Sequence, residues 1–161
     1  MNKAGMPISS FASHNDASPL FTPGTTVQDK ATGNVYKYIQ VEDAALAVGD
    51  VVEYSNTTGW EVTKDRAGGS SLGRIAAGVA LGTVTDAYYG WVQVAGVNTY
   101  TKTDGSVAVG NALVPHATAD GQADTAESGS TAVNTEAQVF GYALVADTTS
   151  ACSAVMLRCA Y

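Results

Sequence analysis

The residues that could perform chemistry are few and scattered along the chain. The two histidines, His14 and His116, have no cysteine or second histidine beside them, and we expect both to be solvated rather than bound to a metal. The loop "GGSSLGR" lacks the lysine and Ser/Thr that complete a phosphate-binding loop. We therefore expect no catalytic residues, no metal site and no cofactor, and we predict that the protein is not an enzyme.

One loop carries enough carboxylates to raise the question of calcium. In "DGQADTAE" the side chains of Asp120, Asp124 and Glu127 offer oxygen ligands of the kind that Ca²⁺ prefers. Their spacing is not that of an EF-hand, and exposed loops are commonly acidic. Both interpretations stay open. The simpler one is a loop that points to solvent, away from any partner, because carboxylates are costly to desolvate.

The aromatic cluster in "AYYGWV" is a second candidate. Tyr88, Tyr89 and Trp91 could stack on a sugar, or they could belong to the core and to the rim of a barrel. The two cysteines, Cys152 and Cys159, are seven residues apart, so one strand would place them on opposite faces. We expect reduced thiols, and a disulfide would require a bend between them.

The charge balance argues against several kinds of partner. Eight Lys and Arg residues stand against fifteen Asp and Glu, which gives a formal net charge of −7. So few cations are unsuited to nucleic-acid phosphates or anionic lipid. No stretch approaches the roughly eighteen uninterrupted apolar residues of a membrane-spanning helix, and the first residues do not resemble a signal peptide. We expect synthesis in a cytoplasm and no binding to nucleic acid or membrane.

Short strands are the elements that would position these residues. In "VYKYIQVE", Val35 and Ile39 share one face while Tyr36 and Tyr38 share the other. "DVVEY" and "WEVT" flank the turn-forming "SNTTG", which predicts a hairpin, and "IAAGVALGTV" and "WVQVAG" predict two further strands. Long helical periodicity is missing from the sequence. It therefore predicts an all-β fold with at most one short helix.

The first 30 residues differ from the rest. They carry three of the four prolines and show no alternation, which is typical of an extended arm that precedes a β domain at 31–161. Several of the arm's residues are unusually apolar for a free tail. We expect these residues to bind a neighbouring subunit or another protein rather than their own domain: Met6, Ile8, Phe11, Leu20 and Phe21.

The chain also repeats itself at a spacing of 61 to 63 residues. "AVGDVV" at 47–52 returns as "AVGNAL" at 108–113, "GVAL" at 78–81 as "GYAL" at 141–144, and "WVQV" at 91–94 as "AVML" at 154–157; Asp86 aligns with Asp147. These landmarks predict two pseudo-repeats, at about 46–97 and 107–160. Since one unit alone would have an open edge and half a core, we expect the pair to close a compact β-barrel or small sandwich.

These phrases resemble the small capsid decoration, or cement, proteins of tailed bacteriophages. The resemblance lies in residues 47–52, 78–84, 90–96 and 107–114, preceded by the Pro/Ser-rich arm. It implies a homotrimer that stands on the outer surface of the virion, binds the major capsid protein and carries no active site. A virion head fibre or carbohydrate-binding adhesion module, using Tyr88, Tyr89 and Trp91, is the alternative.

Overall fold

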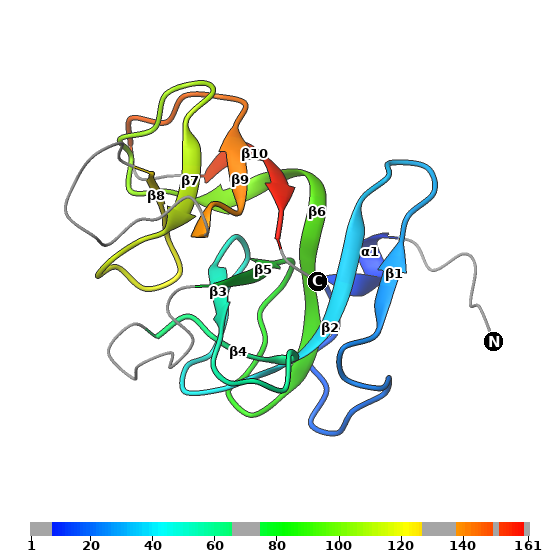
Figure 1. Ribbon diagram of the computed structural model, residues 1–161. Coiled ribbons are helices and arrows are strands. Elements are labelled where there is room, and N and C mark those ends of the chain that lie inside the picture. The colour runs from blue at the N-terminus through cyan, green and yellow to red at the C-terminus, as the bar shows by residue number, and fades with distance from the viewer. Residues whose placement is uncertain (1–7, 66–74, 127–137, 150–151, 160–161) are drawn as a thin grey trace.

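A computed structural model of the chain describes residues 8–65, 75–126, 138–149 and 152–159, which form an almost purely β fold (Figure 1). This confirms the predicted fold class. The single helical turn is α1 (Ile8–Phe11). The strands are β1 (Thr26–Gln28), β2 (Val35–Val41), β3 (Val51–Tyr54), β4 (Glu61–Thr63), β5 (Ala76–Ala80), β6 (Tyr89–Lys102), β7 (Ala112–Pro115), β8 (Ala123–Thr125), β9 (Gly141–Ala143) and β10 (Cys152–Arg158).

Five strands close a first barrel. Their order is β2-β4-β3-β5-β6, and β2 also pairs with β6, which joins the two ends of the sheet. The predicted alternation holds in the two closing strands, because Ile39 and Val92 face the main core while Tyr38 and Trp91 face outward. The first barrel therefore has an apolar interior and an aromatic outer face on β2 and β6.

The second barrel continues from the same long strand. β6 has 14 residues, and its second half pairs with β10, followed by β9, β7 and β8. A parallel bridge between Thr103 and Ala123 brings β8 back beside the end of β6. One continuous strand thus belongs to both barrels, and it runs from the first to the second in Figure 1.

The registers of the two barrels confirm the predicted duplication. Val52 pairs with Gly78 as Leu113 pairs with Gly141, at offsets of 61 and 63 residues. The later strands match in the same way, because Ala80 pairs with Val92 as Ala143 pairs with Val155.

Three details of the predicted duplication are wrong. Each repeat begins one strand earlier than expected, at β2 and at the second half of β6. Each unit closes its own barrel, because its first strand pairs with its last, so the two units need not combine to remove an open edge. The residue of the first repeat that is equivalent to Asp147 is Val84 rather than Asp86, since the Leu46–Val84 bridge corresponds to the Val107–Asp147 bridge.

The repeated sequence segments "AVGD" and "AVGN" form equivalent turns. The Asp50 carboxylate accepts a hydrogen bond from the Ala47 amide at 2.8 Å, and the Asn111 side chain accepts one from the Ala108 amide at 2.7 Å. The intervening Gly49 has a φ of 84°, a conformation that favours glycine, and a Cβ there would collide with the carbonyl oxygen of Tyr100. The turn chemistry therefore explains why the sequence repeats at this place.

Asp50 also joins the two barrels. Its side chain is 3 % exposed and lies 2.5 Å from Lys102 Nζ and 3.0 Å from Lys64 Nζ. Lys102 ends the shared strand on the side of the second barrel, and the Val51 amide donates to the Gly121 carbonyl of the second barrel at 2.8 Å. One cluster of buried apolar residues includes members of both barrels. Ion pairs of Asp50 and a shared apolar core therefore both join the two barrels.

Candidate functional site

The N-terminal segment covers the aromatic outer face of the first barrel. Phe11 is buried against Tyr36, at 4.9 Å between ring centroids, and against Trp91, at 4.8 Å. Phe21 meets Tyr38 at 5.2 Å and Trp91 at 5.3 Å. Such edge-to-face and offset contacts stabilise aromatic pairs beyond the area that they bury. The segment is therefore integrated into the domain along residues 11–21.

Polar contacts fix the middle of this segment. Asp16 and Tyr89 exchange two backbone hydrogen bonds of 2.9 Å, which adds a short bridge to the edge of the first barrel. The Asp16 carboxylate accepts a 2.7 Å hydrogen bond from the Tyr38 hydroxyl and lies 2.9 Å from His14 Nδ1. Burial of the Tyr38 hydroxyl, together with its bond to Asp16, raises the pKa of this phenol well above its ordinary value.

This packing corrects two expectations. The prediction that the apolar arm residues lie against another chain instead of their own domain is wrong for Phe11 and Phe21, because the outward-facing aromatic side chains of β2 and β6 supply an apolar surface within reach. His14, expected in solvent, lies among the same aromatic rings, 5.6 Å from Phe21. Leu20 is 65 % exposed. Ile8 begins α1, and Met6 lies outside the described residues.

The proposed sugar-binding cluster is divided by the alternation of β6. Trp91 is 1 % exposed beneath the N-terminal segment, and its indole nitrogen has no hydrogen-bond partner within the described part of the chain. Tyr89 packs on the same side, whereas Tyr88 packs against the main core. The three rings do not share an exposed face, so they do not form a platform on which a sugar could stack.

His116 also has neighbours that the sequence did not reveal. Ligand atoms of Asp104, His116 and Asp124 lie within 4.8 Å of one another, since the β7–β8 hairpin folds back beside the residues that follow β6. However, His116 Nδ1 accepts hydrogen bonds from the Thr118 amide at 3.0 Å and the Ala119 amide at 2.8 Å. The neutral ring then carries its proton on Nε2. A metal at Nε2 would require that proton to move to Nδ1, against two N–H donors, so the geometry opposes a metal site.

Of the three carboxylates of the acidic loop, the structure brings, within the described residues, only Asp124 beside a further carboxylate, that of Asp104. Asp120 is exposed, and Asp124 Oδ1 already accepts a hydrogen bond from the Thr125 amide at 2.6 Å. Glu127 lies outside the described residues. The prediction that Asp120 points to solvent agrees with its exposure.

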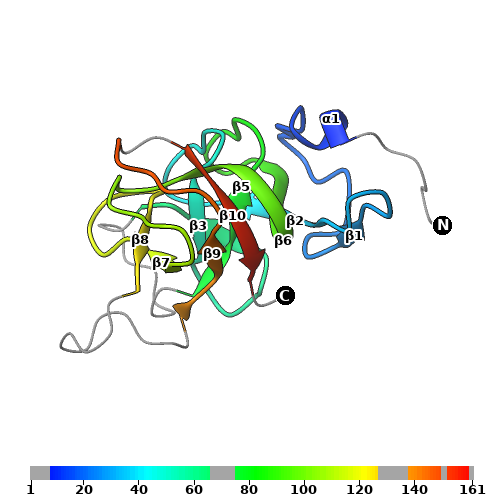
Figure 2. The same cartoon turned by 90° about the horizontal axis from the view of Figure 1, so that it is seen from above.

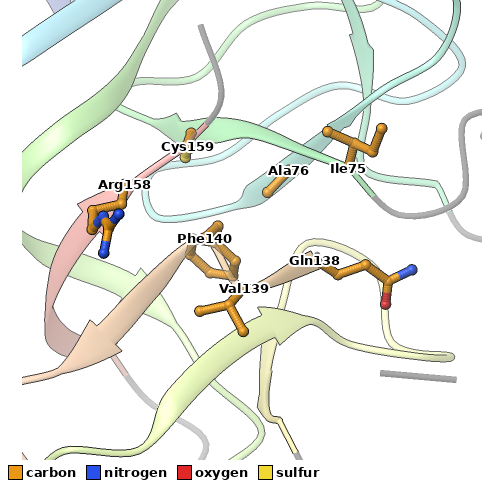
Figure 3. Close-up of a pocket in the computed structure, with 7 residues that line it drawn as sticks. All are labelled: Ile75, Ala76, Gln138, Val139, Phe140, Arg158 and Cys159. Atoms are coloured by element: carbon orange, nitrogen blue, oxygen red, sulfur yellow. The ribbon is translucent and has the colours of Figure 1, made fainter. Parts of the chain in front are cut away.

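A pocket of about 180 Å³ lies at the seam between the barrels (Figure 3). Its lining comes from the beginning of β5, the residues before β9 and the end of β10: Ile75, Ala76, Gln138, Val139, Phe140, Arg158 and Cys159. Burial raises the pKa of the Cys159 thiol to about 12, which makes this thiol a poor nucleophile near neutral pH. Cys152 is exposed, and neither cysteine forms a disulfide. The lining of the pocket thus combines apolar side chains with the polar groups of Gln138 and Arg158.

One motif of interest, in the loop at residues 68–74, falls where the structure gives no description. The Gly-x-Ser-x-Gly spacing at residues 69–73, in the loop where we expected no active site, occurs between β4 and β5 and not between a strand and a helix, the context in which such a serine becomes a nucleophile. Within the described ranges, no helix is long and apolar enough to cross a membrane.

Exposed apolar side chains gather on the second barrel. Of ten large hydrophobic side chains with substantial exposure among the described residues, seven lie between positions 97 and 156: Val97, Tyr100, Val109, Tyr142, Leu144, Val145 and Met156. Several of them are cross-strand neighbours on β6, β10 and β9. This distribution makes the outer surface of the second barrel the leading candidate for contact with another molecule.

The fold and these surfaces define an architecture of two tandem five-stranded barrels that share a strand. No protein-family model matches the sequence, and a search of curated proteins found no relative. Among solved structures, the fold is similar to that of the head fiber gp8.5 N base in bacteriophage phi29, with a TM-score of 0.52 and 17 % sequence identity. The similarity covers 77 % of this chain and 93 % of that one.

Proposed function

We propose that this chain is a structural protein of a bacteriophage virion. The observation that carries the proposal is the likeness of its fold to a phage head-fibre base, which extends over 93 % of that chain. The resemblance of several short sequence segments to phage decoration proteins independently supports a role in a virion. The role proposed is architectural: the chain acts by binding other virion subunits, not by transforming a substrate.

In its more specific form, the proposal is a decoration protein on the outer surface of the head. A homotrimer would bind the major capsid protein and bridge neighbouring subunits, so that each subunit must break several contacts to leave the shell. A ligand that binds only the assembled state stabilises it by about 2.7 kcal/mol at one hundred times its dissociation constant. The net charge of −7 favours the outer face over the face that meets packaged DNA.

A head fibre is the second candidate, and the name of the structural neighbour favours it specifically. A fibre base would also attach to the head, but its purpose would be to hold an adhesive element that contacts the host. Since the rings of Tyr88, Tyr89 and Trp91 are divided between two faces, adhesion by this chain would require another surface. Both candidates therefore place the chain on the phage head. They differ in whether the chain stabilises the shell or supports adsorption to the host.

One localisation experiment and two comparisons of particles test these candidates. Cryo-microscopy of the virion tests whether the chain lies on the outer face of the head. Particles with and without the protein are then compared for DNA release on heating and for adsorption to host cells. A decoration protein predicts earlier DNA release without the protein and normal adsorption. A fibre base predicts normal heat resistance and reduced adsorption. A chain missing from the head would contradict both.

A further inference from the structure

The two histidines of the chain have opposite kinds of neighbour. His14 Nδ1 lies 2.9 Å from a carboxylate oxygen of Asp16, so this ring can donate there whether it is neutral or charged. His116 Nδ1 instead accepts hydrogen bonds from the Thr118 amide at 3.0 Å and the Ala119 amide at 2.8 Å. A ring nitrogen accepts only while it carries no proton. The two contacts of His116 Nδ1 therefore exist only in the neutral form of the ring.

These two bonds brace the turn of the β7–β8 hairpin. The His116 amide donates to the Gln122 carbonyl at 2.9 Å, which closes the hairpin around residues 117–121. The imidazole accepts from the amides two and three residues further on, as the side-chain oxygen of an Asn or Asp does in a turn. The neutral ring is thus part of the hydrogen bonding that shapes this turn.

The same turn contacts the first barrel. The Val51 amide, at the start of β3, donates to the Gly121 carbonyl at 2.8 Å. Gly121 is buried with a φ of 67°, and a Cβ on it would lie 3.0 Å from Asp50 Cγ. The backbone of the turn therefore lies against the carboxylate that pairs with Lys102 and Lys64. The conformation of the turn consequently bears on the seam between the two barrels.

Carboxylates lie close to the ring. An oxygen of Asp104, an oxygen of Asp124 and a ring nitrogen of His116 lie within 4.8 Å of one another, and all three residues are partly buried. Asp104 follows β6 and Asp124 belongs to β8, while Asp120, in the turn itself, is exposed. Nearby negative charge favours a protonated imidazole. Two states of the ring therefore compete: a neutral ring that holds the turn, and a charged ring that the two carboxylates attract.

Histidine is the side chain whose charge ordinarily changes between pH 5 and 8. We infer that His116 is a pH-sensitive switch at the seam between the barrels: the neutral ring holds residues 117–121 against Val51 and Asp50, and protonation releases them. The added proton occupies Nδ1, so the two amides of the turn lose their acceptor. The switch consists of contacts within the chain and does not depend on the proposed virion role.

Amide hydrogen exchange, measured by NMR on the full chain at about pH 8 and about pH 5.5, tests the switch. The readout is the protection factor of the Val51 amide, which corrects for the effect of pH on chemical exchange itself. We expect it to fall about tenfold at the lower pH, because two hydrogen bonds of the turn are lost. The Tyr38 amide, bonded to the Thr25 carbonyl at 2.9 Å, is the internal control and should keep its protection, since β1 and β8 lie on opposite sides of the molecule (Figures 1 and 2).

Asparagine is the matched substitution. His116→Asn keeps an oxygen that can accept from both amides, and it removes the ring that titrates. We expect the Val51 protection factor of this variant to be the same at both pH values. His14→Asn removes the other histidine and should respond to pH as the unmodified chain does. Circular dichroism establishes that each variant is folded.

Four results would overturn the inference. They are equal Val51 protection at both pH values in the unmodified chain, a fall that persists in folded His116→Asn, a fall that His14→Asn abolishes, and an equal fall at Tyr38. If His116→Asn does not fold, the nitrogen chemical shifts of the His116 ring give its titration in the unmodified chain. The loss of Val51 protection should then follow that titration, and a loss at a different pH would contradict the switch.

Discussion

Replacement of Asp50 by asparagine should weaken the seam between the two barrels while it preserves the turn. Asn111 shows that asparagine accepts the turn hydrogen bond in the equivalent position, at 2.7 Å from the Ala108 amide. Asp50→Asn therefore retains the bond to the Ala47 amide. It removes the negative charge that lies 2.5 Å from Lys102 Nζ and 3.0 Å from Lys64 Nζ.

The size of the effect follows from the burial of the partners. Hydrogen bonds to charged groups contribute about 1.5–3 kcal/mol each. The Lys64 and Lys102 side chains are 23 % and 35 % exposed, so water compensates part of the loss when their partner is neutral. We expect Asp50→Asn to lower the free energy of unfolding by about 2 kcal/mol in total. The reciprocal change, Asn111→Asp, retains the turn hydrogen bond and should change the free energy of unfolding by about 0.5 kcal/mol or less.

Urea denaturation of four chains measures this prediction: the unmodified chain, Asp50→Asn, Lys102→Met and the double variant. A double-mutant cycle isolates the interaction between the two side chains, and we expect a coupling of about 1–2 kcal/mol. Asn111→Asp is the control for the turn. Equal losses for Asp50→Asn and Asn111→Asp, or a coupling indistinguishable from zero, would refute the argument that Asp50 stabilises the seam through charge.

Three further predictions follow from the packing. Phe11→Ala should lower the free energy of unfolding by about 3 kcal/mol in chemical denaturation, because the ring is buried, whereas the exposed Leu20→Ala should cost about 0.5 kcal/mol or less. Deletion of residues 1–25 should reduce the thermal midpoint, since it uncovers the aromatic face; an unchanged midpoint would show that the segment does not contribute to the fold. The buried Cys159 thiol has its pKa raised from 9.0 to about 12, so the folded state holds its proton where the unfolded state loses it. The contribution of this thiol to the free energy of unfolding is complete below pH 9 and declines as the pH rises toward 12. In that window the free energy of unfolding falls by about 1.4 kcal/mol per pH unit. Cys159→Ala should flatten the alkaline slope and Cys152→Ala should not.

Some of this structure could be derived from the sequence, because the information is local. Alternation in residues 35–42 predicted a strand with Ile39 and Tyr38 on opposite faces, and this assignment is confirmed. A hairpin was expected around "SNTTG", and β3 and β4 flank it. The recurrence of "AVGD" as "AVGN" identified equivalent turns, since Gly49 and Gly110 must both adopt a positive φ. The repeat was therefore visible wherever the backbone geometry constrained the residue type.

Only the tertiary structure decided which surfaces meet. The apolar character of Phe11 and Phe21 predicted burial, but the partner proved to be the same chain, because a pattern of hydrophobicity specifies that a side chain avoids water and not what covers it. Asp104, His116 and Asp124 converge only after the β7–β8 hairpin folds back beside the end of β6. The sequence also gave no sign that one strand serves both barrels. That arrangement depends on long-range pairing of β6 with β2 and β10, which brings together segments far apart in the chain and so leaves no local pattern in the sequence.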